Sequence, residues 1–308
     1  MTSPKFSFVL VTYNNADTIK PCLASIAAFT SSSYEILIVD NSPDNETLCV
    51  IESFISANPE VTVRITKPEA NLGFGRACNL AASHANGQLL FLLNPDSLLM
   101  NDAAELLADC LNNHARSLAA GPAIFDSSGR ISITCRNLPN LGRIILDATG
   151  LDSFFGAYRL TRFAHDVPRQ VDQIIGAALL VPSIMYKRLG GMDERFFVYF
   201  EEVDFCKRLK EAGGEIWFWP KAKVQHLSGQ SCEASSVRAR MIFVLRQSRK
   251  KYFTKHFGLI GGAAMDLINR LEGLEKSLVL AALWLLRRKP SDRDKAQGFW
   301  AVAKGTAP

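Results

Sequence analysis

The chain has 308 residues, of which 48% are hydrophobic, and a formal net charge of +5. This apolar content suffices for one large globular domain or two ordinary ones, and it excludes a disordered or fibrous chain. The weak and mostly diffuse positive charge argues against nucleic acid as a partner.

Seven cysteines are scattered along the chain, and none stands in a Cys-x-x-Cys pair. They indicate neither a disulfide framework nor a zinc site and favour a reducing compartment. The first residues enter a strand-like pattern without the basic and apolar regions of a secretory signal. We therefore expect a cytoplasmic protein.

The first 93 residues alternate between apolar runs typical of strands and segments with helical spacing. Near-continuous Ile, Val and Leu predicts strands buried on both faces, as in a parallel sheet covered by helices. The predicted fold class is therefore α/β with a mostly parallel central sheet. The predicted strands cover residues 6–13, 34–40, 61–66 and 88–93, and the predicted helices cover residues 18–29, 44–57 and 75–84.

Polar residues follow three of these strands at their carboxyl ends, where open α/β sheets bind ligands. Each residue taken singly also suits an ordinary turn, because Asn, Asp and Ser side chains hydrogen-bond to nearby backbone. Three such strand ends together predict a binding rim. The rim residues are Thr12, Tyr13, Asn14, Asp40, Asn41, Asn94 and Asp96.

A glycine-containing segment follows the third predicted strand. Asn71 and Gly73 lie in it, and Asn79 comes one helical turn further on. The glycines predict a close approach of backbone to a ligand. The segment does not match G-x-G-x-x-G and does not follow the first strand, which argues against a dinucleotide-binding fold.

Asp96 offers the hard oxygen ligand that Mg²⁺ or Mn²⁺ prefers. Because Mg²⁺ typically binds one or two carboxylates plus substrate phosphates, a nucleotide diphosphate would complete its shell. His226, at the end of a later short strand, is a candidate further ligand. A lone histidine is more often simply hydrogen-bonded, and this alternative stays open.

Three carboxylates, Glu201, Glu202 and Asp204, lie within four positions at the start of an amphipathic helical pattern. The aromatic flanks Phe196 and Phe197 predict a cleft floor, where a base would meet an acceptor hydroxyl. The alternative is a solvated charge run that is favourable at a helix start.

The second half of the chain is less regular. Residues 136–170 predict a mobile loop or flap, with plain disorder as the alternative. A change to helical character predicts a sheet domain over residues 1–232 and a helical, basic extension over residues 233–308. The remaining strands are predicted at 171–181, 215–219 and 223–226, and the remaining helices at 234–257 and 265–288.

The last predicted helix carries an apolar stripe, Trp284 and a basic cluster at Arg287, Arg288 and Lys289. Only nine residues there are uninterrupted apolar, which is too few to cross a bilayer. The pattern favours an interfacial helix, and a helix packed on the domain or in a homodimer is the alternative.

Taken together, these motifs resemble those of family 2 glycosyltransferases with the GT-A fold, over about residues 5–258. The second half strengthens the likeness, particularly to the bacterial rhamnosyltransferase branch. The motifs are Val11 to Asn14, Ile38 to Ser42, Asn71 to Asn79, Leu93 to Asp96, Gly176 to Val181, Gly191 to Phe197, the acidic run at Glu201, and Val224 to His226.

The resemblance implies an inverting, metal-dependent hexosyltransferase that acts in cell-surface polysaccharide synthesis. The donor would be a dTDP- or UDP-sugar, with L-rhamnose from dTDP-rhamnose as the first choice, and the acceptor a glycan or a polyprenyl-diphosphate-linked glycan. Asp96 and His226 would hold Mg²⁺ or Mn²⁺, and Asn94 replaces the first Asp of the family's D-x-D motif. Residues implied to bind the nucleotide sugar are Thr12, Tyr13, Asn14, Asp40, Asn41, Asn71, Gly73, Asn79, Asn94 and Asp96.

The resemblance also assigns the catalytic base. The family generally uses the second residue of a Glu-Asp pair, so the role falls on Glu202, with Asp204 or Asp193 orienting the acceptor. The C-terminal helices would hold the enzyme at the inner face of the plasma membrane as a peripheral protein. The acceptor-side residues would be Gly176, Ala177 and Glu201.

Two other classes remain as alternatives. A sugar nucleotidyltransferase shares the α/β layout but normally has a Gly-rich, Arg- or Lys-bearing loop after the first strand, where this chain has Thr12 to Asn15. A non-catalytic glycan-binding protein on the same fold is the second alternative, because fold alone does not establish function.

Overall fold

A computed structural model describes residues 3–227 and 235–307. The described residues form two compact units. The sheet unit comprises residues 3–138, 159–194 and 201–227, and the helical unit comprises residues 139–158, 195–200 and 235–307. The chain thus enters the helical unit twice before its C-terminal helices. The predicted boundary at 232/233 lies outside the described residues and stays a prediction.

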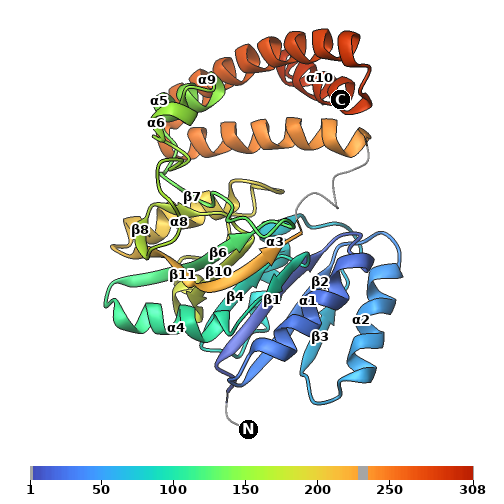
Figure 1. The fold of residues 1–308 in the computed structure, drawn as a ribbon, viewed down its shortest axis with the longest axis vertical. Coiled ribbons are helices and arrows are strands. Elements are labelled where there is room, and N and C mark those ends of the chain that lie inside the picture. Colours follow the sequence, from blue (N-terminus) through green and yellow to red (C-terminus); the bar gives the residue numbers. More distant parts are fainter. Residues whose placement is uncertain (1–2, 228–234, 308) are drawn as a thin grey trace. The chain divides into compact units, whose positions relative to one another are not determined.

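The sheet unit contains a nine-stranded mixed sheet with the order β3-β2-β1-β4-β10-β6-β11-β5, in which β8 also pairs with β11 (Figure 1). Strands β1 to β4 are mutually parallel, and so are β6 and β11. The mostly parallel α/β sheet predicted from the sequence is confirmed. The strands are β1 (Phe6–Thr12), β2 (Tyr34–Asp40), β3 (Val63–Thr66), β4 (Leu89–Leu93), β5 (Ser97–Leu99), β6 (Ser117–Phe125), β8 (Arg169–Val171), β10 (Ala178–Pro182) and β11 (Glu215–His226).

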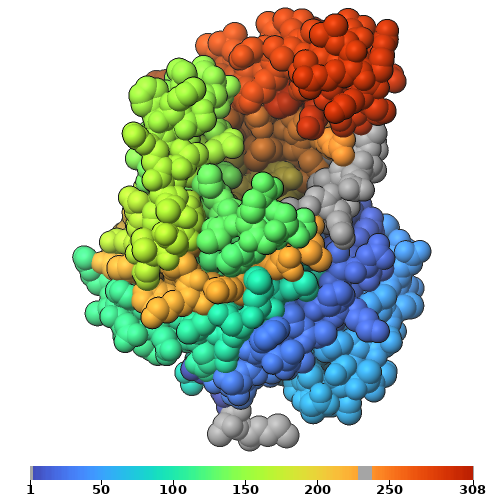
Figure 2. Space-filling model, viewed as in Figure 1, coloured from blue at the N-terminus to red at the C-terminus, as the bar shows by residue number. Residues whose placement is uncertain are grey.

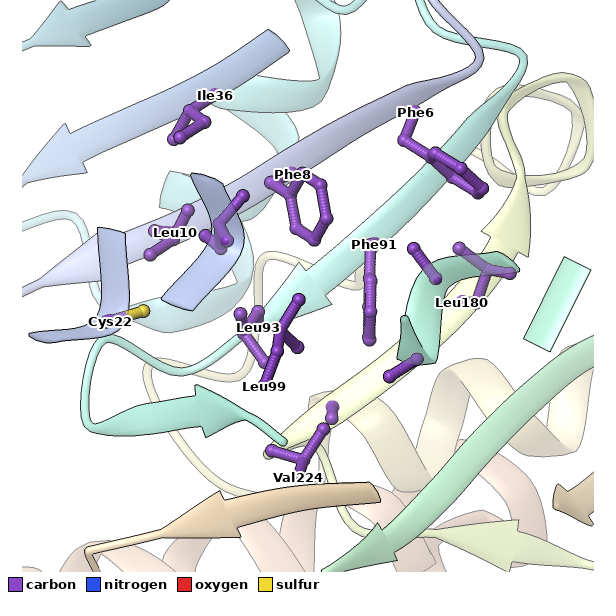
Figure 3. Packing of buried hydrophobic residues seen from close by; sticks show 14 of the residues in the cluster. Phe6, Phe8, Leu10, Cys22, Ile36, Phe91, Leu93, Leu99, Leu180 and Val224 are labelled. Carbon is purple, nitrogen blue, oxygen red and sulfur yellow. The ribbon is translucent and has the colours of Figure 1, made fainter. Parts of the chain in front are cut away.

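Both faces of the sheet are buried because successive side chains of a strand point to opposite faces. In β1, Phe8 and Leu10 join one hydrophobic cluster and Val9 and Val11 the other. The rings of Phe8 and Phe91 lie 5.3 Å apart in the first cluster (Figure 3). Helices α1 (Ala16–Phe29), α2 (Glu46–Ala57) and α4 (Ala103–Asn113) pack on that side, and α3 (Phe74–Ser83), α7 (Ser183–Arg188) and α8 (Glu201–Glu211) on the other.

Two strand predictions in the second half are wrong. Residues 171–181 form parts of three short strands, because β9 (Gln173–Ile174) leaves the main sheet to pair with β7 (Cys135–Arg136). Residues 215–219 and 223–226 belong to one strand, β11, whose register shifts between Trp219 and Lys223. Pro220 lies in that shift, where its missing N–H costs no ladder bond.

The helical unit consists of α5 (Leu141–Ala148), α6 (Asp152–Phe155), α9 (Ser235–Arg287) and α10 (Pro290–Lys304). Part of the predicted flap is therefore helical. The two predicted C-terminal helices are the two arms of α9, which meet at Gly258, where φ is 71° and ψ is −174°. The arms fold against each other, since Arg246 and Arg249 both bond to Glu272. None of the helices that the structure describes has the length and apolar content of a membrane span.

Candidate active site

The first part of the site surrounds Asp40, which ends β2 and is fully buried. Its carboxylate accepts hydrogen bonds from Thr12 Oγ1 at 2.8 Å and Ser42 Oγ at 2.6 Å, and forms an ion pair with Lys67 Nζ at 2.9 Å. Burial alone would raise the pKa of Asp40, but the bonds from Ser42, Lys67 and Thr12 together lower it. Asp40 is therefore ionised and fixed in orientation.

Lys67 was not among the predicted site residues. It directly follows β3, so the strand-end rule that selected the other rim residues also applies to it. Besides Asp40, its ammonium donates to the carbonyls of Ser42 and Asp44 at 3.0 and 2.6 Å. Lys67 therefore ties the ends of β2 and β3 together.

The glycine segment packs against the rim through Asn41, and its approach to a ligand stays a prediction. Asn41 accepts a hydrogen bond from the Leu72 N–H and donates to the Gly73 carbonyl, each at 3.2 Å. Gly73 has φ 77°, a left-handed conformation that glycine adopts without strain. Asn71 caps the turn by accepting from the Gly73 N–H at 2.8 Å. Asn41, Asn71 and Gly73 therefore form one structured loop at the start of α3.

Tyr13 and Asn14 end the same rim on the β1 side. Both are exposed, Asn14 has φ 57°, and the Asn14 N–H donates to Ser42 Oγ at 2.9 Å. The exposed Tyr13 ring next to the fixed Asp40 network offers a surface on which a flat base can stack.

The second part of the site brings together Asp96 and His226, which are distant in sequence. Antiparallel pairing of β5 with β11 places His226 opposite Ser97, next to Asp96. As a result, Asp96 Oδ1 lies 3.0 Å from His226 Nε2. The amide of Asn94, where the family has its first Asp, lies 3.4 Å from the same nitrogen.

These side chains fit a divalent cation that is shared with a substrate. No group of three or more His, Cys, Asp or Glu suited to a metal occurs in residues 3–227 and 235–307. A carboxylate and an imidazole would therefore supply the protein ligands, and diphosphate oxygens the rest, as in sites that bind Mg²⁺ through substrate phosphates. The Asp96–His226 contact within the protein shows that the two groups reach a common point.

The third part of the site is the start of α8. A Cβ atom added to Gly176 would lie 3.4 Å from Glu202 Cβ, so Gly176 packs directly against that side chain. The next residue, Ala177, accepts a hydrogen bond from the Asn94 N–H at 2.9 Å. Residues 176 and 177 thus connect the predicted base to the predicted metal ligands within the sheet unit.

Glu201 and Glu202 differ in their surroundings. Glu201 is 4% exposed and Glu202 is half-buried, although the Oε2 atom of each is buried. Burial and the charge of the neighbouring Glu202 raise the pKa of Glu201 well above its usual range. Burial therefore favours the protonated form of Glu201 over its charged form.

The two residues before α8 have strained backbones. Tyr199 and Phe200 have φ values of 67° and 70°, a region that residues with side chains rarely enter. Such strain clusters at functional sites, where the surrounding structure compensates for it. Here it lies immediately before the acidic pair in the chain.

The remaining predicted residues hold the segment before α8. Asn79 accepts from the Tyr186 hydroxyl and the Met192 N–H, each at 2.8 Å, and donates to the Met192 carbonyl and to Glu194. The buried Asp204 pairs with Arg208 at 2.7 Å. Arg208 in turn donates to the carbonyls of Leu189 and Gly191.

These bonds show a supporting position for Asn79 and Asp204. Their contact with donor or acceptor stays a prediction, as does that of Asp193, which is half-buried in the segment they hold.

Comparison with known sequences identifies the family. The family model described as glycosyl transferase family 2 matches residues 7–165. An N-acetylglucosaminyl-diphospho-decaprenol L-rhamnosyltransferase of Mycobacterium tuberculosis is 29% identical over 241 residues, which are 72% of this chain and 76% of that protein. A PGL/p-HBAD biosynthesis glycosyltransferase of Mycobacterium bovis is 33% identical over 131 residues, 42% of this chain and 50% of that protein.

Two solved structures share the fold. The mannosyltransferase PcManGT of Pyrobaculum calidifontis, in complex with GDP-Man and Mn²⁺, gives a TM-score of 0.60 at 16% identity, over 99% of this chain and 87% of that chain. TarS of S. aureus, residues 1–349, gives 0.52 at 16% identity, over 98% and 92%. The chain belongs to glycosyl transferase family 2, as a glycosyltransferase with the GT-A fold that takes a nucleotide-sugar donor.

Proposed function

We propose that this enzyme transfers L-rhamnose from dTDP-rhamnose, with inversion and with Mg²⁺ or Mn²⁺, to a polyprenyl-diphosphate-linked glycan. The sugar and the acceptor class rest on the name of the M. tuberculosis relative, which is 29% identical over 72% of this chain. The metal rests on the Asp96–His226 contact at 3.0 Å. That contact is the observation that carries the proposal, because it joins a carboxylate in the turn before β5 to an imidazole at the end of β11.

Each part of the site has a task in this reaction. Asp40, held ionised by Thr12, Ser42 and Lys67, fixes the strand-end rim against which the nucleoside binds. Asp96 and His226 hold the cation, which when bound neutralises the charge that builds on the leaving diphosphate. The loop at Gly73 brings backbone close to the donor.

Glu202 removes the proton of the acceptor hydroxyl as that oxygen attacks the anomeric carbon. The carbon–oxygen bond to the diphosphate breaks on the opposite face, so the anomeric configuration inverts. Glu201, whose pKa is raised by burial, precedes Glu202 in the first turn of α8. Gly176 has no side chain and can therefore pack directly against the side chain of the base.

The acceptor's lipid anchor would keep the reaction at the inner face of the plasma membrane, with the protein bound peripherally. Family membership argues against the sugar nucleotidyltransferase alternative.

The test is a transfer assay with purified protein and a short-chain polyprenyl-diphosphate N-acetylglucosamine acceptor. We expect dTDP-rhamnose to be used in preference to UDP-glucose and GDP-mannose. Chelation should stop the reaction, and Mg²⁺ or Mn²⁺ should restore it. Mass spectrometry would identify the added deoxyhexose, and NMR would give its anomeric configuration. Preference for another donor would refute the assignment of the sugar, a retained anomeric configuration would refute inversion, and full activity in chelator would refute the metal requirement.

A further inference from the structure

The C-terminal helices carry an excess of positive charge, part of which lies in residues 276–308. Residues 276–308 contain seven lysines and arginines and two aspartates. Their difference of five equals the net charge of the whole chain, so residues 1–275 are neutral as a group. A local excess of this kind attracts an anionic partner.

The second arm of α9 carries an exposed apolar stripe beside this charge. The stripe consists of leucines that recur at helical spacing on one face. Each is between 42% and 61% exposed, and the first and last are about 27 Å apart along the helix axis. The stripe is Leu267, Leu271, Leu274, Leu278 and Leu285.

The neighbours of this arm within the helical unit lie on its other faces. The first arm of α9 bonds to Glu272 and Asn269. Helix α10 packs at Gly273, where an added Cβ would lie 2.7 Å from the Phe299 carbonyl oxygen. Neither of these neighbours therefore covers the stripe.

Aromatic rings and cations border the stripe where α9 meets α10. Trp284, Trp300 and Leu278 line a largely apolar groove of about 350 Å³ between the two helices. The guanidiniums of Arg288 and Arg293 lie 5.3 and 5.8 Å from the Trp284 ring. In Figure 2 the atoms of this end of the chain, orange-red and red, form one continuous block.

We propose that this face of the helical unit, the leucine stripe with Trp284, Trp300 and the cations around them, docks on an anionic bilayer leaflet. The stripe would lie in the plane of the interface, the tryptophans at the headgroup level, and Arg287, Arg288, Lys289 and Arg293 on lipid phosphates. Charge decides between a bilayer and a second copy of the chain. A second copy would bring an equal positive charge to the same surface, whereas anionic lipids neutralise it.

This inference rests on the proposed function only in naming the membrane that holds the acceptor. The test is therefore flotation of the full-length protein with vesicles, in the absence of donor and acceptor. The vesicles are phosphatidylcholine with and without phosphatidylglycerol. We expect binding only with phosphatidylglycerol, and release as salt is raised.

Two variants probe the two parts of the surface. Leu271→Glu/Leu278→Glu should abolish flotation. Arg287→Gln/Arg288→Gln should weaken it about 30-fold at low ionic strength. Matched control variants on the sheet unit are Phe29→Glu/Ile184→Glu, which change exposed apolar residues, and Arg116→Gln/Arg130→Gln, which remove two exposed positive charges.

The controls should bind as the wild type does, and all five proteins should show the same circular dichroism. Absence of flotation of the wild type, or equal loss in the controls, would overturn the proposal. Light scattering provides a second readout. If the leucine variant turned a dimer into a monomer while vesicle binding persisted, the face would be an interface between copies. Failure of sugar transfer with normal flotation would refute the proposed function alone.

Discussion

The N–H of Asn94 donates to the carbonyl of Ala177 at 2.9 Å, and this bond joins two parts of the candidate site. Asn94 precedes Asp96, which forms the predicted metal-ligand pair with His226, and Ala177 follows Gly176, which packs against Glu202. The bond continues the antiparallel ladder of β4 and β10, in which Leu93 pairs with Ala178. The pairing of two central strands therefore fixes the predicted metal ligands relative to the proposed base.

Replacing the proposed base should separate chemistry from donor binding. Glu202→Gln keeps the size of the side chain but cannot take a proton, so we expect the transfer rate to fall about 10²- to 10⁴-fold. Donor affinity, measured by calorimetry, should stay within a few-fold of wild type. Glu211→Gln at the exposed end of the same helix is the control and should be as active as wild type. Near-normal turnover of Glu202→Gln would place the base elsewhere.

Removing one predicted metal ligand should change the metal requirement. For His226→Ala we expect the Mn²⁺ concentration that gives half-maximal donor binding to rise about 10- to 100-fold, as for other losses around metal sites. Calorimetric titrations of the donor at a series of Mn²⁺ concentrations would measure this. His84→Ala, on an exposed helix end, is the control. An unchanged Mn²⁺ dependence in His226→Ala would exclude it as a ligand.

Much of this site could be predicted from sequence because it lies at strand ends. Apolar runs locate β1, β2 and β4, and the polar residues that follow them must then share one edge of the sheet. The contact of Asp96 with His226 depends on β5, a three-residue strand too short to show a pattern. Proximity of the two was implied by the family resemblance, but the strand pairing behind it was not.

Strand β6 and helix α10 are among the elements that were not predicted, and each has a physical reason. Strand β6 contains Gly121 and Pro122, which have low strand propensity. Contacts with residues distant in sequence stabilise it instead. One of these is Ile174, which packs so closely that a Cβ atom added to Gly121 would lie 2.7 Å from it. Helix α10 begins at Pro290, directly after a basic run that is typical of the end of a helix, so the sequence indicated no new helix there. Proline is in fact favourable at the first helical position.

The ion pair between Lys67 and Asp40 should contribute measurably to the free energy of unfolding. Lys67→Met removes a donor from the buried Asp40 carboxylate and should lower the free energy of unfolding by about 1–3 kcal/mol at neutral pH. The usual pKa of the carboxyl is 3.8, and the folded protein lowers it, so its stabilising effect is present above that value. The effect is lost as the pH falls through the lower, folded-state pKa, and the difference between variant and wild type should shrink there.

Urea unfolding at a series of pH values would measure this difference. Lys207→Met removes an exposed pair with Glu211 and serves as the control, with an expected change of about 0.3–0.5 kcal/mol. A Lys67→Met effect no larger than the control would show that the other hydrogen bonds suffice to hold Asp40.

The packing of the two arms of α9 against each other should depend on one buried carboxylate, that of Glu272. Glu272 is 4% exposed and pairs with Arg246 at 2.6 Å, Arg249 at 2.5 Å and Lys276 at 2.6 Å. Burial opposes its charge, but the arginines Arg246 and Arg249 outweigh burial and hold the pKa of Glu272 well below its usual range. Glu272→Gln leaves these cations uncompensated and should destabilise the helical unit by about 3–5 kcal/mol.

Glu275→Gln, exposed three residues further along, is the matched control and should have little effect. Because the folded pKa of Glu272 is depressed, its contribution is present above the usual value of 4.5 and lost only as the pH falls through the folded-state value. Hydrogen exchange of the α9 amides, compared between the two variants, would locate the change in the helical unit. Equal protection in both variants would mean that apolar packing alone holds the arms together.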